Sequence, residues 1–232
     1  MPKVIKIPKL KNHSYNLKLI FLKYLNSFFI FFLLFVSACF KADKTLPVIF
    51  LNQISPVIIT FGDDYLDNKV TAQDDRDGDI SSLINSTGLV NNKLAGEYSV
   101  RYNVMDASGN KAMPLEKMVF VRHRNFTLKG IYQTNCACNN AQSDSIYYSS
   151  ISASMLNQDE IIISNLLDGK NMVFDGFLSG NTSQKLYFQN VFSYDTLFSC
   201  YGQIDNRGQE INLIIYRQKG SFKDTCLLTL QK

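Results

Sequence analysis

From about residue 45 onward, the chain consists of short apolar runs in which apolar and polar residues often alternate. The clearest example is Tyr98–Met105, where tyrosine or valine occupies every second position from Tyr98 to Val104. A period of two is typical of an antiparallel β-strand with one buried face. The pattern therefore predicts an all-β protein.

Residues 123–232 contain about eight such runs, separated by turn residues at intervals of roughly 10–15 residues. In chain order, the runs are FTLKGIYQT, SIYYSSISASM, EIIISNL, MVFDGFL, KLYFQNV, TLFSCYGQI, INLIIYR and TCLLTLQ. None of them has a convincing helical periodicity. Consecutive hairpins at this spacing predict an antiparallel up-and-down β-meander that closes into a small barrel, because closure removes exposed strand edges.

Residues 46–122 predict a second β-module. Tyr98 stands at the start of a late strand, where Ig-like sandwiches carry their tyrosine corner. In the order and content of LPVIFLN, DDRDGDIS, AGEYSVRYNVMDASGN and MVFV, the module resembles the bacterial Ig-like domain called after a pesticidal crystal protein, which is related to hyalin-repeat modules. The resemblance implies a sandwich of seven or nearly seven strands that serves as a non-catalytic spacer or adhesive module. Pro114 indicates that the last strand begins late or lies at an edge.

The stretches GIY (130–132), SISASM, EIIISNL and TCLLTLQK resemble the lipocalin-like, β-rich module that follows such Ig-like domains in lipoproteins of Bacteroidota. This resemblance implies a β-barrel. The expected order is therefore a cleaved lipoprotein signal peptide, a tether, an Ig-like β-sandwich and an antiparallel β-meander or small barrel. The expected domain boundaries are 1–38, 39–45, 46–122 and 123–232.

The leader combines a lysine-rich stretch with the apolar run FFIFFLLFV at residues 28–36. As a helix, this run would span about half of a bilayer core of about 30 Å, so a spanning helix is disfavoured. The run ends in Val36, Ser37, Ala38 and Cys39, which resemble the lipobox of bacterial lipoproteins. In that family, cleavage after the small residues makes the cysteine the first residue of the mature chain.

The lipobox resemblance implies acylation of Cys39, by chains such as palmitate, and hence a lipid bilayer as partner. Two or more acyl chains anchor a protein stably, whereas one holds it only marginally. The mature chain would continue with Phe40 rather than aspartate. By analogy with lipoprotein sorting in Gram-negative bacteria, this favours the outer membrane. Whether the protein faces the periplasm or the outside stays open.

The formal net charge of +4 is misleading, because residues 1–38 contain six lysines and no acidic residue. The remaining residues carry 18 basic and 20 acidic side chains, a net charge of −2. A weakly acidic mature protein lacks the basic surface that nucleic-acid binding requires. Nucleic acid is therefore excluded as a partner.

The four cysteines after Cys39 all lie in the last module, at Cys136, Cys138, Cys200 and Cys226. Export to an oxidising compartment predicts disulfides among them. If the barrel closes, its first and last strands are neighbours, so Cys136 or Cys138 should bond to Cys226. A bond between Cys136 and Cys138 would close a strained ring. Cys200 then takes the remaining partner or stays a buried thiol.

A cluster of four aspartates in the DDRDGDIS loop raises the question of calcium, which takes six to eight oxygen ligands. The four are Asp74, Asp75, Asp77 and Asp79, with Asp106 as a candidate further ligand. Their spacing is not that of an EF-hand, and Arg76 weakens the local negative field. Asp and Gly are also the residues that a tight solvated turn requires. We expect a structural turn, with calcium as the weaker alternative and no cofactor.

Catalytic motifs are not apparent. His123 is the one histidine outside the leader, and its place in a short polar junction, His123–Asn125, predicts a solvated role. A C-x-C pair has metal-ligand spacing, but the mature chain offers few further ligands, so no metal is expected. The sequence contains no nucleophile-elbow, Walker or dinucleotide motif. We therefore expect a protein that is not an enzyme.

The aromatic side chains of the last module bear on binding. Most should build the core, and any that stay exposed could form a stacking platform for sugars. They are Tyr147, Tyr148, Phe174, Phe177, Tyr187, Phe188, Phe192, Tyr194, Phe198 and Tyr201. The expected function is non-catalytic binding or adhesion, with a polysaccharide or an envelope protein as partner. The alternatives are a lipocalin-like carrier of a small apolar ligand and, less favoured, an envelope glycoside hydrolase or its accessory.

Overall fold

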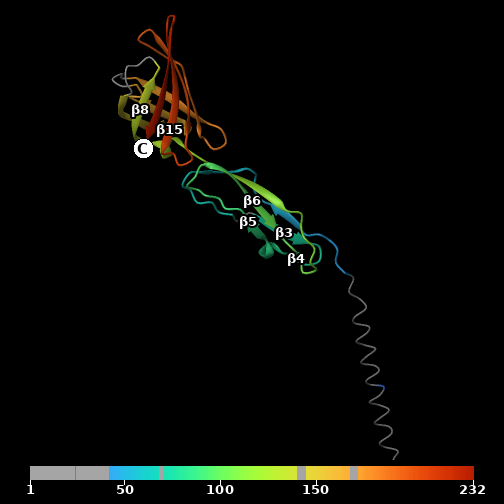
Figure 1. Cartoon of the computed structure of the whole chain (residues 1–232). Coiled ribbons are helices and arrows are strands. Elements are labelled where there is room, and N and C mark those ends of the chain that lie inside the picture. The colour runs from blue at the N-terminus through green and yellow to red at the C-terminus, as the bar shows by residue number, and fades with distance from the viewer. Residues whose placement is uncertain (1–23, 25–41, 68–69, 140–144, 168–171) are drawn as a thin grey trace, which may run out of the picture. The chain divides into compact units, whose positions relative to one another are not determined.

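The computed structural model describes Tyr24 and residues 42–67, 70–139, 145–167 and 172–232 (Figure 1). The chain divides into two compact units, residues 1–44 and 45–232. The predicted signal peptide, its cleavage motif Val36–Ala38 and the acylation site Cys39 lie outside the described residues. Among the described residues, no helix is both long and apolar enough to cross a bilayer.

Seven strands and one 3-10 turn build the first part of the 45–232 unit. One sheet has the order β1-β3-β4 and the other has the order β2-β7-β6-β5, in which β2 and β7 run parallel. The bounds are β1 Val48–Leu51, β2 Val57–Thr60, β3 Val70–Asp74, β4 Gly78–Asp79, η1 Ser81–Leu83, β5 Asn85–Thr87, β6 Gly96–Asn103 and β7 Leu115–Arg122. The expectation of an Ig-like domain is confirmed.

Strand β6 contains the alternating run that the sequence singled out. Val100 and Tyr102 are buried, and the intervening Arg101 is exposed. The hydroxyl of Tyr98 donates a hydrogen bond of 2.8 Å to the carbonyl of Leu94, which is the contact of a tyrosine corner. The last strand, β7, begins directly after Pro114, as the missing N–H of proline predicted.

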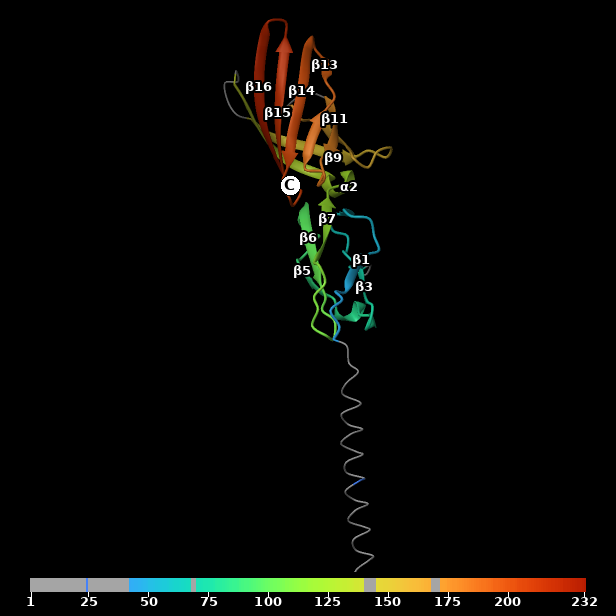
Figure 2. The same cartoon turned by 90° about the vertical axis from the view of Figure 1, so that its right-hand side faces the viewer.

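The second part is an eight-stranded antiparallel barrel, with β8, β9, β10, β11, β12, β14, β15 and β16 around the ring (Figure 2). Pairing of β12 with β14 completes the ring, and β13 pairs with β14 beside it. The bounds are β8 Gly130–Cys138, β9 Ser145–Ala153, β10 Glu160–Ser164, β11 Val173–Ser179, β12 Lys185–Phe188, β13 Val191–Ser193, β14 Thr196–Ile204, β15 Glu210–Lys219 and β16 Phe222–Gln231. The predicted meander and its closure are confirmed.

One predicted strand is wrong at its beginning. The run FTLKGIYQT starts in a short helix, α2 (Asn125–Leu128), and β8 begins only at Gly130. The Thr127 hydroxyl donates to the carbonyl of Arg124, which favours a tight turn over an extended chain. The turn places Leu128 in the barrel core, where it is fully buried.

Of the two pairings expected for Cys226, the structure has the disulfide with Cys138, and these residues are register partners of β16 and β8. The Cys136 sulfur lies 3.7 Å from that of Cys138. Cys200 is a buried thiol outside the disulfide, and burial raises its pKa to about 12. The disulfide therefore joins the first and last strands of the barrel.

Candidate functional site

A row of apolar side chains crosses the outer face of five neighbouring barrel strands. Each member is the register partner of the next, and together they span β11, β12, β14, β15 and β16. In order, the members are Phe177, Tyr187, Tyr201, Ile214 and Leu227. Tyr187 is 52% exposed, Tyr201 47% and Leu227 55%. Several large apolar surfaces are therefore open to solvent side by side.

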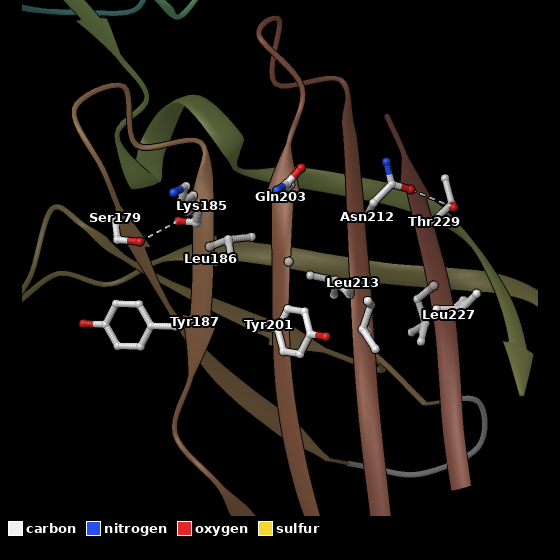
Figure 3. A pocket seen from close by; sticks show the side chains of 13 residues that line it. Ser179, Lys185, Leu186, Tyr187, Tyr201, Gln203, Asn212, Leu213, Leu227 and Thr229 are labelled. Carbon is white, nitrogen blue, oxygen red and sulfur yellow. Dashed lines mark hydrogen bonds between the residues drawn. The ribbon is translucent and has the colours of Figure 1, made fainter.

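A row of hydrogen-bonding side chains runs directly beside the apolar row on the same face. Its members stand two residues away on each strand and again pair in register across the five strands. They are Ser179, Lys185, Gln203, Asn212 and Thr229. Figure 3 shows Tyr187, Tyr201 and Leu227 side by side, with Lys185, Gln203, Asn212 and Thr229 in the adjacent row. We call this pair of rows the two-row face.

All residues of the two-row face except Phe177 line a groove of about 800 Å³. The alternation along each strand builds it, because outward residues such as Tyr201 flank inward ones such as Gly202. Glycine is required there, since a Cβ at position 202 would approach the Asn212 carbonyl oxygen to 2.5 Å. The close approach of β14 and β15 thus depends on a residue without a side chain.

Neighbouring side chains hold the aromatic rings of the groove in place. Tyr187 stacks on Phe177 with ring centroids 5.3 Å apart. The hydroxyl groups of Tyr201 and Tyr216 are hydrogen-bonded at 2.8 Å. This hydrogen bond raises the pKa of Tyr201 above the ordinary tyrosine value of about 10, at which the side chain is already uncharged at neutral pH. The rings therefore form a preorganised, neutral stacking surface.

The polar row has one fixed part and one open part. The Asn212 amide donates to Glu210 at 2.8 Å, and the Thr229 hydroxyl donates to Asn212 Oδ1 at 2.9 Å. Within the described chain, the side chains of Lys185 and Gln203 have no hydrogen-bond or ion-pair partner. Their donors are therefore available to a ligand.

The lining of the groove combines apolar side chains with neutral and cationic hydrogen-bond donors. Its thirteen described lining residues include no carboxylate, histidine or cysteine. A general base paired with an acid or nucleophile needs such groups within hydrogen-bond reach. What the groove offers instead is ring faces on one side and neutral or cationic donors on the other.

Sequence reasoning found part of this site. The expectation that most of the ten aromatics build the core is wrong, because five of them are exposed and only four are buried: Tyr147, Phe174, Phe188 and Phe198. Tyr187 and Tyr201 are among the exposed remainder. The polar row was missed, because Lys185, Gln203 and Asn212 belong to three different strands. Register between strands, which no local pattern encodes, brings them together.

The aspartate loop serves the turn itself. Asp74 Oδ2 accepts the N–H groups of Arg76 and Asp77 at 2.9 and 3.0 Å. Asp79 accepts both the N–H and the hydroxyl of Ser81, and these bonds lower the pKa of Asp79. The other oxygen of Asp74 is buried without a hydrogen-bond partner. The structure thus gives Asp74 and Asp79 turn-forming roles.

Two further members of the candidate cation set also accept hydrogen bonds from protein groups. Asp77 Oδ2 accepts the N–H of Ala107 at 2.8 Å, and Asp75 Oδ2 accepts the Thr45 hydroxyl at 3.2 Å. Asp106 is likewise engaged, accepting the N–H of Asn110 at 2.8 Å. These contacts agree with the expected structural turn, and the calcium alternative stays a prediction.

The expectation of a solvated His123 is wrong, because this side chain is fully buried. Its ring lies 4.9 Å from that of Phe61, and Nε2 lies 3.3 Å from the Asp205 carbonyl oxygen. Burial lowers the pKa of His123. The flanking Arg122 and Arg124 both bond to Asp159 Oδ1 at 2.7 Å. The junction is therefore a packed cluster, which its polar sequence did not indicate.

Fold and groove together define an all-β protein with an Ig-like domain, an eight-stranded antiparallel barrel and a groove on the outer face of that barrel. Residues 49–119 match the family described as "Bacterial surface protein, Ig-like domain". A domain of this family fits a protein of the bacterial cell envelope. A search of curated proteins gave no match.

Two of the similar solved structures come from Bacteroides species. The lipoprotein BT2262 from Bacteroides thetaiotaomicron is 13% identical, with 80% of this chain and 100% of that chain covered and a TM-score of 0.32. A protein of Bacteroides fragilis NCTC 9343, provisionally assigned to the outer membrane, is 14% identical, with 70% and 83% covered and a TM-score of 0.33. At this level of similarity, function has to be argued from the residues of the chain itself.

Proposed function

We propose that the protein is a lipid-anchored envelope protein that binds carbohydrate non-catalytically along the two-row face. The observation that carries this proposal is the side-by-side position of the apolar row and the polar row. A sugar ring presents a C–H face beside an edge of hydroxyl groups. A surface with rings in one row and hydrogen-bond donors in the next is complementary to both.

The dimensions support a ligand of several linked sugar rings. Neighbouring strands lie about 4.8 Å apart, so a row across five strands extends over roughly 19 Å. The groove volume of about 800 Å³ falls in the usual range for ligand sites. A linear oligosaccharide lying across the strands would place successive rings over Tyr187, Tyr201 and the aliphatic side chains beyond them.

The barrel interior favours this outer site over an internal carrier site. A single hydrophobic cluster of inward side chains, including Phe174, Phe198, Ile211 and Leu213, fills the space between the strands. Carriers of small apolar ligands instead keep a cavity inside the barrel. We propose no catalytic step, because the described lining of the groove contains no carboxylate, histidine or cysteine. We assign the Ig-like domain the role of a spacer.

Anchoring is the second element of the proposal. The lipobox motif ending in Cys39 supports acylation, and Phe40 in the next position supports sorting to the outer membrane. We expect Cys39→Ser to release the protein from membranes, because the acyl chains supply the hydrophobic attachment. Continued membrane association of this variant after a carbonate wash would contradict the lipoprotein assignment.

Binding is tested by removing the rings. The full-length protein in detergent is screened on a glycan array, and the affinity for the best oligosaccharide is measured by calorimetry. Tyr201→Ala should weaken binding about tenfold, equivalent to about 1.4 kcal/mol, because the central stacking face is lost. Tyr148→Ala is the matched control, since Tyr148 is exposed outside the groove. Equal affinities of both variants and the wild type would exclude the two-row face as the site.

A further inference from the structure

A second depression adjoins the groove at its polar edge. It has a volume of about 490 Å³, and it shares Ser179, Lys185 and Gln203 with the groove. Its other walls include Thr182 and Gln184. A ligand lying along the polar row can therefore extend a substituent into this second depression, which we call the side pocket.

Lys185 stands where the groove and the side pocket meet. It is the one lining residue of the groove, among those described, that is charged at neutral pH. Its ammonium group has no ion-pair partner within the described residues. Gln203, its register partner on β14, adds an amide donor beside it. The junction thus presents an uncompensated cation with a neutral donor next to it.

The side pocket adds further donors around the same point. The Thr182 hydroxyl donates to Gln184 Oε1 at 2.7 Å, which leaves the Gln184 amide nitrogen to act as a donor. The one carboxylate of the described lining, Glu97, accepts the amide of Asn181 at 2.8 Å. An anionic group near Lys185 would be attracted by the ammonium and weakly repelled by Glu97.

We propose that the carbohydrate bound by the two-row face is acidic, with a carboxylate or sulfate group of one sugar held at Lys185 in the side pocket. This inference rests on the proposed function, and it assigns the class of glycan. A lysine ammonium is a compact charge with three donors and accepts either anion without a fixed geometry. The tyrosine rings supply affinity for the sugar backbone, and Lys185 supplies selection for the charged substituent.

The test compares matched pairs of oligosaccharides on the full-length protein in detergent. The carboxylate pair is an oligogalacturonate and its methyl ester, and the sulfate pair is a keratan sulfate oligosaccharide, which contains no uronic acid, and its desulfated, neutral form. The wild type should bind the acidic member of at least one pair about tenfold more tightly, as expected for a hydrogen bond to a charged group. High salt should reduce this preference, since the contact is solvent-accessible. The pair that shows the preference identifies the anion.

Two substitutions test the role of charge, one removing a positive charge and the other removing a negative charge. Lys185→Met should abolish the preference for the acidic member, because the ammonium charge is lost, and should weaken binding of the acidic member more than binding of the neutral member. Glu97→Gln should raise the affinity for the acidic member about twofold, because it removes a nearby negative charge. Lys223→Met is the control, since Lys223 is an exposed lysine outside both depressions.

The outcomes separate this inference from the proposed function. Equal binding of acidic and neutral members, or an unchanged preference in Lys185→Met, overturns the acidic assignment. If Tyr201→Ala still weakens binding in that case, the carbohydrate site itself stands. If the protein binds neither member of either pair nor any glycan of the array, both proposals are wrong.

Discussion

The Ig-like domain and the barrel reach stability by different means. The barrel encloses a single cluster of 23 buried apolar residues among those described. In the described part of the Ig-like domain, two clusters hold four buried apolar residues each, completed by half-buried neighbours. A small apolar core leaves a domain marginally stable, because little surface is buried per residue. The smaller domain therefore depends more on individual polar contacts.

Lys117 is the most instructive of these contacts. It stands on β7 with no exposed surface, and its ammonium group is paired with Asp67 and lies 5.4 and 5.3 Å from the ring centres of Tyr65 and Tyr102. Burial alone would lower the pKa of Lys117, but the hydrogen bonds with Asp67 and Tyr65 outweigh it and raise the pKa. The charge is thus tolerated only because a carboxylate and two rings surround it.

The barrel contains a disulfide between its first strand, β8, and its last strand, β16. This bond links the ends of the module, whereas the Asp67–Lys117 pair links segments within the smaller domain. The large apolar core of the barrel is thus supplemented by a covalent bond between its first and last strands and by the ion pair of Arg217 with the buried Asp224. The smaller core of the Ig-like domain is supplemented by the buried ion pair of Lys117 with Asp67.

The largest expected effect on stability comes from removing the disulfide between β8 and β16. The disulfide joins residues 88 positions apart, and on the chain-entropy model its loss should destabilise the barrel by roughly 4–5 kcal/mol. Cys226→Ser should therefore lower the barrel's unfolding transition in calorimetry and leave that of the Ig-like domain in place. Cys200→Ala is the control, because this buried thiol lies outside the bond. If the unfolding transitions of the barrel and the Ig-like domain shifted equally, the disulfide would not stabilise the barrel alone.

The next effect concerns the buried ion pair. Asp67→Ala leaves the Lys117 ammonium buried without its carboxylate, which should destabilise the Ig-like domain by about 3 kcal/mol. Lys117→Met should cost less, because Asp67 is partly exposed and keeps hydrogen bonds from Tyr65 and Tyr102. The measure is chemical denaturation, and the double variant should recover part of the loss. A double variant as unstable as the sum of both would show that the pair is not coupled.

Much of the fold could be predicted because alternation and turns are local signals. Each of the eight apolar runs after residue 123 contributes a barrel strand, and closure follows from the tendency to cover strand edges. The start of FTLKGIYQT was misread because a single helical turn such as α2 is too short to show a period. Tyr98 was placed correctly because its preceding Gly96 and Glu97 mark the beginning of β6.

The candidate site was harder to predict, because it depends on register. Tyr201 and Lys185 are sixteen positions apart in sequence, and only the pairing of β12 with β14 places their rows side by side. For Lys117 a usable signal did exist. Period two puts it on the same face as Val119 and Val121, both fully buried. A charged residue at an inward position predicts a buried partner, whose identity the sequence leaves open.

The smallest expected effect concerns the joint between the two regions, where His123 is buried and its pKa is lowered by burial. The unfolded chain has a histidine pKa of about 6.5, so it takes up a proton that the folded state resists. The resulting stability is complete above that pH and is lost as the pH falls below it, by up to about 1.4 kcal/mol per pH unit.

Denaturation curves at a series of pH values from neutral downward measure this loss. His123→Gln should flatten the dependence, since glutamine does not titrate and can still donate to the Asp205 carbonyl. The wild type measured over the same pH series is the reference. If His123→Gln keeps the slope of the wild type, the acid sensitivity belongs to carboxylates elsewhere. His123 would then contribute to the contact between the two regions through packing and not through its titration.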